Sequence, residues 1–433
     1  MPLKPLLAMA CAATTFAVGQ TAPAPVKPEI PVNYDEAQVG TYTLPDPLVL
    51  ANGKSVRDAR TWSETRRPEL VRLFESEQYG RSPGRPADLS FDVFDIGTPV
   101  FGGKAIRKQV EIRFSSVKDS LKAAVLIYLP AAARKPVPLL LQISFVPNSA
   151  MIEDPGIRPG EMWNREKKRV PATESKFPKW KIDDLLSHGF GVATLYYGDI
   201  DPDFAGGLPL GVRALYVKPG ETEPGADEWG SIAAWAWGLS RVMDYLETDS
   251  AVDSKRVALF GISRLGKTVL WAGAHDTRFA MVIASCSGEG GASLSRRNYG
   301  ETVKHMNTNF GYQFARNYQK YGDHVDQLPV DSHLLLSLIA PRPLYLSTGD
   351  TDRWSDPKGE FLAAVAAGPV YRLLGKQGLG TDQMPAAGEG IMHTVGYHMH
   401  AGGHGTIPSD WDYYLKFLEM HFGSGSASTQ SRP

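Results

Sequence analysis

Residues 261–268 read Gly-Ile-Ser-Arg-Leu-Gly-Lys-Thr, and this octapeptide fits two motifs at once. It matches the phosphate-binding loop, in which four residues separate a Gly from Gly-Lys-Thr. It also fits the nucleophile turn of a serine hydrolase, with Ser263 on a sharp bend between a strand and a helix. Both motifs need a strand before and a helix after them. The sequence supplies both, because residues 256–260 are a short apolar run and residues 268–274 are compatible with a helix.

The position of the octapeptide and the residues downstream of it favour the hydrolase. A phosphate-binding loop normally follows an early strand of its domain, whereas about 260 residues precede this one. A nucleotide site also needs a strand that ends in a Mg²⁺-binding Asp. The strand ending at Asp350 could supply it, so the nucleotide interpretation stays open as the alternative. A hydrolase needs an acid and then a His after the Ser, and Asp352 and His404 follow Ser263 in that order.

Length and composition indicate a globular protein with a sizeable core. The 433 residues suffice for one large domain or two small ones, and 42% of them are apolar. A formal net charge of −1 gives no indication of a nucleic-acid or anionic-membrane partner. The 43 Gly and 32 Pro residues predict many loops, as expected of an enzyme whose site lies on connections between strands and helices.

The N-terminus has the pattern of an export signal, which we predict over residues 1–19. Lys4 precedes an apolar run at residues 6–18 that is too short for a membrane-spanning helix. A lipid anchor on Cys11 is the alternative. We therefore expect a secreted or periplasmic protein. Loss of the signal would leave Cys286 as the one cysteine, so no intrachain disulfide is expected.

The rest of the chain divides into three parts by composition. Residues 20–44 begin with a Pro-rich stretch and are predicted to be a linker. Residues 45–422 are predicted to form a single catalytic domain. Residues 423–433 are rich in Gly and Ser and predict a disordered tail.

Apolar periodicity predicts alternating strands and helices over the catalytic domain. Strands are expected at residues 105–114, 123–129, 139–145, 192–197, 257–260, 281–285, 344–347 and 393–397. Helices are expected at residues 61–79, 179–187, 229–246, 331–339, 357–366 and 411–422. The first two strands indicate an antiparallel start of the sheet. The later alternation predicts an α/β fold with a mainly parallel sheet covered on both faces. The charged, Pro-rich residues 151–181 predict an insertion over one face, where substrate selection could lie.

Ser263 is the candidate nucleophile. A Ser hydroxyl attacks well only when a base takes its proton, and the base works best when an acid holds its ring. The motif departs from the common Gly-x-Ser-x-Gly, because Leu265 replaces the second Gly and Gly266 follows one residue late. The structural alternative for Ser263 is a helix N-cap. The downstream acid and His favour the nucleophile.

Four of the ten His residues cluster late in the chain, at positions 393, 398, 400 and 404. A metal site is the alternative, but neither Cys nor an acidic residue accompanies them at ligand spacing, so no metal is expected. His404 stands between two Gly residues just before the last predicted helix, where an α/β-hydrolase places its base. His398 and His400 are expected to make structural hydrogen bonds.

The candidate acid is Asp352, the third residue after Gly349, which ends a predicted strand. That position is the usual place of a hydrolase acid. Asp350 and Asp356 are expected to cap a helix or shape a loop. The candidate triad is therefore Ser263, His404 and Asp352.

Four ordered motifs resemble those of glucuronoyl esterases, carbohydrate esterase family 15. The octapeptide resembles the signature Gly-Cys-Ser-Arg-x-Gly-Lys. Further resemblances are Ser-Gly-Glu-Gly-Gly at residues 287–291 with Arg-Asn-Tyr-Gly-Glu at 297–301, Ala-Pro-Arg-Pro at 340–343 with Trp-Ser-Asp-Pro at 354–357, and Gly-Tyr-His at 396–398 with His404 and Asp-Trp at 410–411. The resemblance covers roughly residues 55–422.

The resemblance implies an α/β-hydrolase, a three-layer αβα sandwich with a mainly parallel central sheet. It implies a serine esterase that cleaves esters between (4-O-methyl-)glucuronate of glucuronoxylan and lignin alcohols, as a monomer without a cofactor. Arg264 would join the oxyanion site, since a cation there stabilises developing negative charge. Lys267, Glu301 and Trp354 match positions that hold the uronate sugar. The alternative for these charged residues is a structural ion-pair network.

One departure from the family concerns the acid. Many members carry a Glu two residues before the Gly of the Ser-Gly-x-Gly-Gly stretch, and here that position is Cys286. Glu289 lies three residues later and is not expected to reach the same place. The resemblance then implies the variant in which the acid follows the next strand, which is again Asp352.

Two other functions remain open at this level. One is an esterase for acetyl or feruloyl groups on xylan. The other is a non-catalytic carbohydrate-binding protein on a hydrolase scaffold.

Overall fold

The computed structural model describes residues 30–116, 121–172, 180, 182–218, 220–221 and 224–423. The predicted export signal, residues 20–29 of the predicted linker and residues 424–433 of the predicted tail lie outside the described residues. The chain divides into two compact units, Met1–Pro31 and Val32–Pro433. The fold and the site below belong to the second unit.

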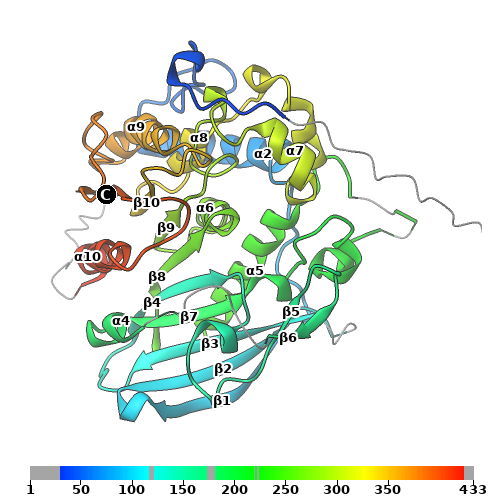
Figure 1. The fold of residues 1–433 in the computed structure, drawn as a ribbon, viewed down its shortest axis with the longest axis vertical. Helices are drawn as coiled ribbons and strands as arrows, with labels where there is room; N and C mark the ends of the chain where they lie inside the picture. Colours follow the sequence, from blue (N-terminus) through cyan, green and yellow to red (C-terminus); the bar gives the residue numbers. More distant parts are fainter. Residues whose placement is uncertain are drawn as a thin grey trace, which may run out of the picture. The chain divides into compact units, whose positions relative to one another are not determined.

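A ten-stranded sheet in the described part of the chain organises this unit (Figure 1). The strand order is β1-β2-β3-β7-β4-β8-β9-β10-β12-β11. The bounds are β1 Ser90–Val100, β2 Ala105–Arg113, β3 Lys122–Pro130, β4 Val137–Ser144, β7 Gly191–Tyr196, β8 Val252–Ile262, β9 Met281–Ser285, β10 Leu344–Gly349, β11 Gly390–Met392 and β12 Val395–His400. Strands from β7 to β12 in this order pair in parallel, while β1, β2, β3 and β11 pair antiparallel.

Helices cover both faces of the sheet, because the central strands are buried on both faces. In β4, Leu139 and Leu141 belong to one apolar cluster and Leu140 to a second. The first cluster also takes apolar residues of α2 (Arg67–Glu77), α5 (Ser231–Leu246), α6 (Arg264–His275), α8 (Ser332–Ser337) and α9 (Pro357–Leu373). The second takes residues of α3 (Asn148–Met151), α4 (Asp183–Ser187) and α10 (Asp410–Phe422). These are the three layers of the predicted α/β-hydrolase sandwich.

The predicted strands and the antiparallel start of the sheet are confirmed, with shifts of a few residues at their ends. Strand β1 was not predicted because it is an exposed edge strand in which Gly97 and Pro99 interrupt the apolar alternation. The predicted irregular insertion, residues 151–181, contains a short hairpin of β5 (Glu161–Trp163) and β6 (Arg169–Pro171) where the structure describes it. Helix α7 (Val303–Phe310) was also not predicted. No helix within the described ranges is long and apolar enough to cross a membrane.

Close packing of α6 on β9 depends on Gly273. A Cβ atom at this position would lie 2.3 Å from Cγ2 of Val282. The absence of a side chain therefore lets the helix that follows Ser263 approach the sheet closely.

We expect Gly273→Ala to lower the free energy of unfolding by about 1–3 kcal/mol through this overlap. In the double variant Gly273→Ala/Val282→Ala the new methyl group occupies the space that Val282 leaves. Its loss of stability in urea unfolding should therefore be smaller than the sum of the two single losses. Additive losses would mean that the helix does not rest on β9 at this point.

Candidate active site

Four neighbouring parallel strands bring the predicted triad to one edge of the sheet. Ser263 directly follows β8, and Cys286 directly follows β9. Asp352 follows the end of β10, and His404 follows the end of β12. Because β8, β9, β10 and β12 are adjacent and parallel, their carboxyl ends meet at the same edge. Ligand sites of open α/β sheets lie at this edge.

Ser263 occupies the strained turn that a nucleophile position requires. Its backbone has φ 58° and ψ −129°, a conformation that residues other than Gly rarely adopt. The Ser263 N–H donates to the carbonyl of Ser285 at 2.8 Å, which ties the turn to the end of β9. Strain of this kind persists only where surrounding bonds over-determine the backbone.

The glycines around Ser263 explain why the motif departs from Gly-x-Ser-x-Gly. A Cβ on Gly261 would lie 2.2 Å from the carbonyl oxygen of Leu265. A Cβ on Gly266 would lie 3.0 Å from both the Ser285 carbonyl oxygen and the Ser287 Cβ. Position 266, rather than 265, is therefore the one that faces the neighbouring strand end.

The same geometry argues against a phosphate-binding loop. Helix α6 already begins at Arg264, and the N–H of Lys267 donates to the Ser263 carbonyl at 3.1 Å. The residues between the two glycines thus complete a strand and start a helix, which leaves no open loop of amides for a phosphate. The Lys267 ammonium is buried against Glu301.

His404 and Asp352, the candidate base and acid, contact each other directly. His404 Nδ1 lies 2.7 Å from Asp352 Oδ2, and Ser355 Oγ lies 3.3 Å from the same nitrogen. Burial raises the pKa of Asp352, but the hydrogen bonds from His404 and Ser355 outweigh it and hold the pKa below its ordinary value. Asp352 is 5% exposed. The carboxylate therefore stays ionised against the ring and fixes its orientation.

The loop that carries His404 is shaped by residues outside the candidate triad. Asp350 accepts a hydrogen bond from the N–H of Gly402 at 2.8 Å. His400 Nε2 lies 3.0 Å from the Gly403 carbonyl, and His398 Nε2 lies 2.8 Å from Asp410 Oδ1. The structural roles predicted for Asp350, His398 and His400 are confirmed. Asp356 also behaves as predicted, since it caps α9 by accepting from the N–H of Gly359.

Cys286 lies beside the base, as its alignment with the family acid implies. Its Sγ, a carboxylate oxygen of Asp352 and a ring nitrogen of His404 all lie within 4.8 Å of one another. Both the carbonyl and the N–H of Gly405 bond Sγ at 3.3 Å. Such a trio could face a metal, but burial and the nearby Glu360 carboxylate raise the pKa of the thiol to about 12. That opposes the thiolate that metal binding needs.

Glu289 points away from His404, as expected. Its Oε1 accepts from the hydroxyls of Ser295 at 2.7 Å and Tyr318 at 2.9 Å. Burial, with the negative charge of Asp331, raises its pKa to about 8. Glu289 therefore stabilises a buried loop and does not orient the base.

Arg264 is held beside Ser263 by a residue that the sequence analysis missed. Its guanidinium forms an ion pair with Asp203 and lies 5.3 Å from the ring centre of Phe310. Burial lowers the pKa of Arg264, but the Asp203 carboxylate outweighs it and keeps the pKa raised. Asp203 also accepts from Tyr312 at 2.9 Å and Gln313 at 2.7 Å. Its position in the sequence could have indicated it, because Asp203 lies in the segment that follows the carboxyl end of β7.

The three candidate sugar-contact residues lie together. Lys267 Nζ is 3.1 Å from Glu301 Oε2. The Glu301 N–H donates to the Trp354 carbonyl at 2.9 Å. The Trp354 side chain packs edge-on against His305, and the residue is 36% exposed. An exposed indole beside a buried ion pair is compatible with a sugar site and with a structural network alike.

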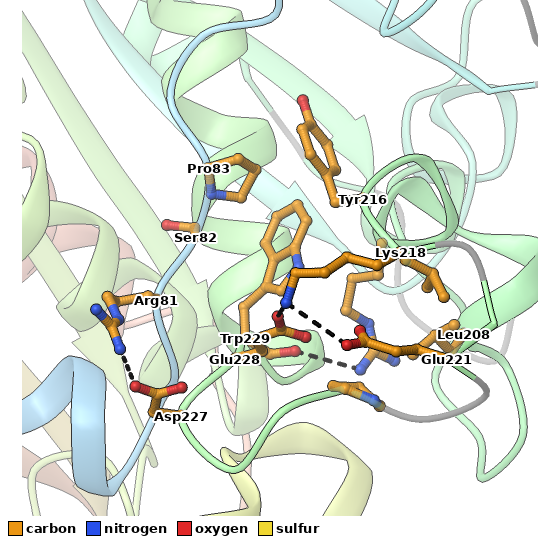
Figure 2. A pocket seen from close by; sticks show the side chains of 13 residues that line it. Arg81, Ser82, Pro83, Leu208, Tyr216, Lys218, Glu221, Asp227, Glu228 and Trp229 are labelled. Carbon is orange, nitrogen blue, oxygen red and sulfur yellow. Dashed lines mark hydrogen bonds and ion pairs between the residues drawn. The ribbon is translucent and has the colours of Figure 1, made fainter.

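A separate cavity of about 370 Å³ lies near the start of α5 (Figure 2). None of the candidate site residues lines it. Two of its ion pairs lie within the lining, since Arg81 bonds Asp227 and Lys218 lies 3.4 Å from Glu228. The described residues that line it include neither His nor Cys, so the candidate site remains the group of strand ends around Ser263.

Comparison with known proteins identifies the family. Residues 224–375 match the protein family described as "Glucuronyl esterase, fungi". The chain is 46% identical over 404 residues to Carbohydrate esterase MZ0003 from an unknown prokaryotic organism, covering 91% of this chain and 93% of that protein. It superimposes on a glucuronoyl esterase from Solibacter usitatus with a TM-score of 0.86 and 47% identity, covering 89% of this chain and all of the other.

The chain belongs to the glucuronoyl esterases, carbohydrate esterase family 15. It is therefore a carboxylic ester hydrolase with the α/β-hydrolase fold. A second structure of this family, a "promiscuous CE15 esterase from the marine bacterial metagenome", has a TM-score of 0.82 and 45% identity, covering 90% of this chain and all of the other. For this glucuronoyl esterase the nucleotide interpretation of the octapeptide is set aside.

We expect Asp352→Asn to lower kcat by roughly 1,000-fold or more, since Asn cannot stabilise the imidazolium and favours the wrong ring tautomer. Asp350→Asn and Glu289→Gln serve as matched controls and should affect kcat far less.

Because Cys286 lies next to His404, Cys286→Glu in the Asp352→Asn background should restore part of the activity, whereas Cys286→Ala alone should be tolerated. Steady-state kinetics and circular dichroism check these outcomes. No rescue in a folded double variant would show that position 286 cannot serve as an acid for His404.

Proposed function

We propose that this glucuronoyl esterase hydrolyses esters between (4-O-methyl-)glucuronate of glucuronoxylan and lignin alcohols, by a Ser-His-Asp mechanism with Ser263, His404 and Asp352. The proposal rests mainly on one observation: the helix that follows Ser263 carries two cationic side chains, Arg264 and Lys267, in its first turn. Arg264 and Lys267 both belong to α6, and each is matched to a carboxylate, Asp203 and Glu301. A uronate ester is a substrate in which the reacting carbonyl and a ring rich in hydroxyls are adjacent.

The proposed reaction has two halves. Ser263 Oγ attacks the ester carbonyl while His404 takes the hydroxyl proton, and Asp352 stabilises the imidazolium that forms. Negative charge then develops on the carbonyl oxygen, beside the Arg264 guanidinium and the backbone N–H groups at the start of α6, which lack partners within the helix. The C–O bond to the alcohol breaks, and the alcohol leaves with the proton from His404.

In the second half, water hydrolyses the acyl-enzyme. His404 takes a proton from water, the hydroxide attacks the acyl carbonyl, and the bond to Ser263 Oγ breaks as Oγ regains the proton. The products are the free uronate and the restored Ser263.

Lys267, Glu301 and Trp354 are proposed to bind the sugar. An ammonium and a carboxylate donate to and accept from ring hydroxyls, and an indole offers an apolar wall. The buried Lys267 and Glu301 charges satisfy each other, which holds them in place before substrate arrives. The N-terminal pattern further supports action outside the cytoplasm, in the periplasm or the medium.

A second candidate is hydrolysis of other ester decorations of xylan, such as acetyl or feruloyl groups. It is favoured by the relative named a promiscuous esterase. Hydrolysis of benzyl glucuronate beside 4-nitrophenyl acetate decides between the two. A higher kcat/KM for the glucuronate ester supports the first candidate, and preference for the acetate supports the second.

We expect Ser263→Ala to lower kcat for both esters by roughly 1,000-fold or more, and the oxyanion site should sustain a low residual activity. The variant should remain folded, because Ser263 makes its structural bond through the backbone N–H. A serine-directed phosphonate should label the parent protein and not the variant. Retention of more than a tenth of the activity would rule out Ser263 as the nucleophile.

We expect Lys267→Met and Glu301→Gln to raise KM for benzyl glucuronate by about 10-fold or more and to change KM for 4-nitrophenyl acetate little. Contacts to the sugar exist in the ground state as well as the transition state, so their loss acts mainly on binding. Lys108→Met is the matched control, since Lys108 lies on β2 and forms a 2.7 Å ion pair with Asp249. Equal effects on both substrates would assign Lys267 and Glu301 to a structural network instead.

A further inference from the structure

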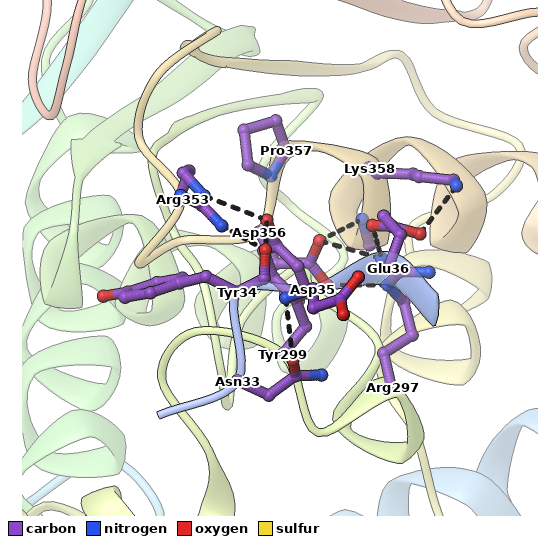
Figure 3. Close-up of polar contacts among 12 residues, drawn as sticks. Asn33, Tyr34, Asp35, Glu36, Arg297, Tyr299, Arg353, Asp356, Pro357 and Lys358 are labelled. Carbon is purple, nitrogen blue, oxygen red and sulfur yellow. Dashed lines mark hydrogen bonds and ion pairs between the residues drawn. The ribbon is translucent and has the colours of Figure 1, made fainter. Parts of the chain in front are cut away.

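Residues 33–36, which we call the N-terminal strap, bind both loops that carry the proposed sugar-contact residues (Figure 3). One loop spans residues 297–301 and ends at Glu301. The other spans residues 353–356, contains Trp354 and leads into α9. We propose that the strap is a positioning element that sets the placement of Glu301 and Trp354 and so the affinity for the uronate sugar. This inference rests on the proposed function, because it concerns the same sugar site.

The strap bonds the residue immediately before each sugar-contact residue. The carbonyl of Asn33 accepts from the N–H of Gly300 at 2.9 Å, next to Glu301. The carbonyl of Tyr34 accepts from the Arg353 guanidinium, next to Trp354. Two adjacent backbone carbonyls of the strap thus reach the two loops at equivalent places.

Side chains strengthen the attachment at Tyr34. The Arg353 guanidinium lies 4.6 Å from the centre of the Tyr34 ring, in cation–π contact. The Tyr299 ring packs edge-on against Tyr34 with centroids 6.1 Å apart, and its hydroxyl donates to the Tyr34 carbonyl at 3.3 Å. One strap residue therefore contacts side chains from both loops.

Glu36 provides a second attachment through charge. It pairs with Arg297 of the first loop at 2.5 Å and with Lys358, in the first turn of α9 directly after the second loop, at 2.7 Å. Arg297 is buried, with 2% of its side chain exposed, and its other partner is Asp356 at 2.8 Å. Glu36 therefore completes the partners of a buried guanidinium that lies between the two loops, where an unmatched charge is costly.

The two loops also touch each other, so a shift in one moves the other. The N–H of Glu301 donates to the Trp354 carbonyl at 2.9 Å. A Cβ on Gly300, which has φ +62°, would lie 2.4 Å from the Arg353 carbonyl oxygen and 2.6 Å from that of Trp354. The strap bonds the same Gly300 through the carbonyl of Asn33.

Asp352 is bonded by Ser355 of the second loop, but it also has anchors that the strap does not touch. Its N–H donates to the Gly349 carbonyl at 3.1 Å, directly at the end of β10. Loosening the strap should therefore disturb Trp354 and Glu301 while leaving the pair of Asp352 and His404 in place. The expected signature is weaker binding of the sugar substrate with little change in the chemical step.

The test uses the full chain with Tyr34→Ala, Glu36→Gln and the double variant, assayed on benzyl glucuronate and on 4-nitrophenyl acetate. The double variant should raise KM for the glucuronate ester by about 3- to 10-fold, since exposed ion pairs and cation–π contacts each shift an equilibrium by a factor of about 2 to 5. The kcat for this ester and both constants for the acetate should stay within about 2-fold of the parent protein.

Two control variants separate positioning from general stability. Tyr34→Phe keeps the ring over Arg353 and should behave like the parent protein. Glu64→Gln removes the same charge from an exposed ion pair with Arg60 on the protein surface and should leave all constants unchanged. Amide hydrogen exchange should rise in residues 298–301 and 353–355 of the double variant and stay unchanged in β8 and β9.

The outcomes distinguish this inference from the proposed function. Unchanged KM and unchanged exchange in the double variant would overturn the strap while leaving the esterase proposal intact. An equal loss on both substrates would make the strap merely structural and overturn its positioning role. Failure of the parent protein to hydrolyse the glucuronate ester would overturn the proposed substrate. In that case faster exchange confined to the two loops would still support the strap, and unchanged exchange would overturn it.

Discussion

The hydrogen bond from the Ser263 N–H to the Ser285 carbonyl holds the site together. It ties the strained turn at the end of β8, where Ser263 has a positive φ, to the end of β9, and so fixes where the serine side chain leaves the backbone. Cys286 follows directly and contacts the loop that carries His404. His404 in turn meets Asp352 from the end of β10. These contacts join the carboxyl ends of β8, β9, β10 and β12, so the order and register of the parallel strands set the arrangement of the candidate triad.

Paired charges keep the surroundings of the turn in one geometry. Arg264 with Asp203, Lys267 with Glu301 and Arg297 with Asp356 lie within the same region of the molecule. Desolvating a charge costs several kcal/mol, and pairing offsets that cost only when the partner is well placed. Such pairs contribute little net stability, but any other placement of the loops would separate them and leave buried charges unmatched. The cations beside Ser263 are therefore held in one position.

The candidate acid could be supplied to His404 from either of two strand ends. A carboxylate after β9 would occupy the position of Cys286, and the thiol there has its pKa raised to about 12. Asp352 after β10 reaches the same ring at 2.7 Å. Because both strand ends border the His404 loop, the acid can move between them without a change of fold. The chemistry needs only a carboxylate in contact with the ring nitrogen.

The sequence by itself determined the α/β layers, the strand, turn and helix around Ser263 and the order of acid and His after it. These are local or periodic patterns, and a few residues are enough to express them. The family resemblance in four ordered motifs likewise required no coordinates. The tertiary structure decided which side chains meet: Asp203 with Arg264, Glu289 away from His404, and residues 33–36 against two distant loops. Residues 33–36 lie within the range predicted to be a linker, and nothing in that sequence predicted their contact with the two loops. Contacts of this kind join segments far apart in the chain, and their partners are chosen by the folded backbone, so no local pattern in the sequence encodes them.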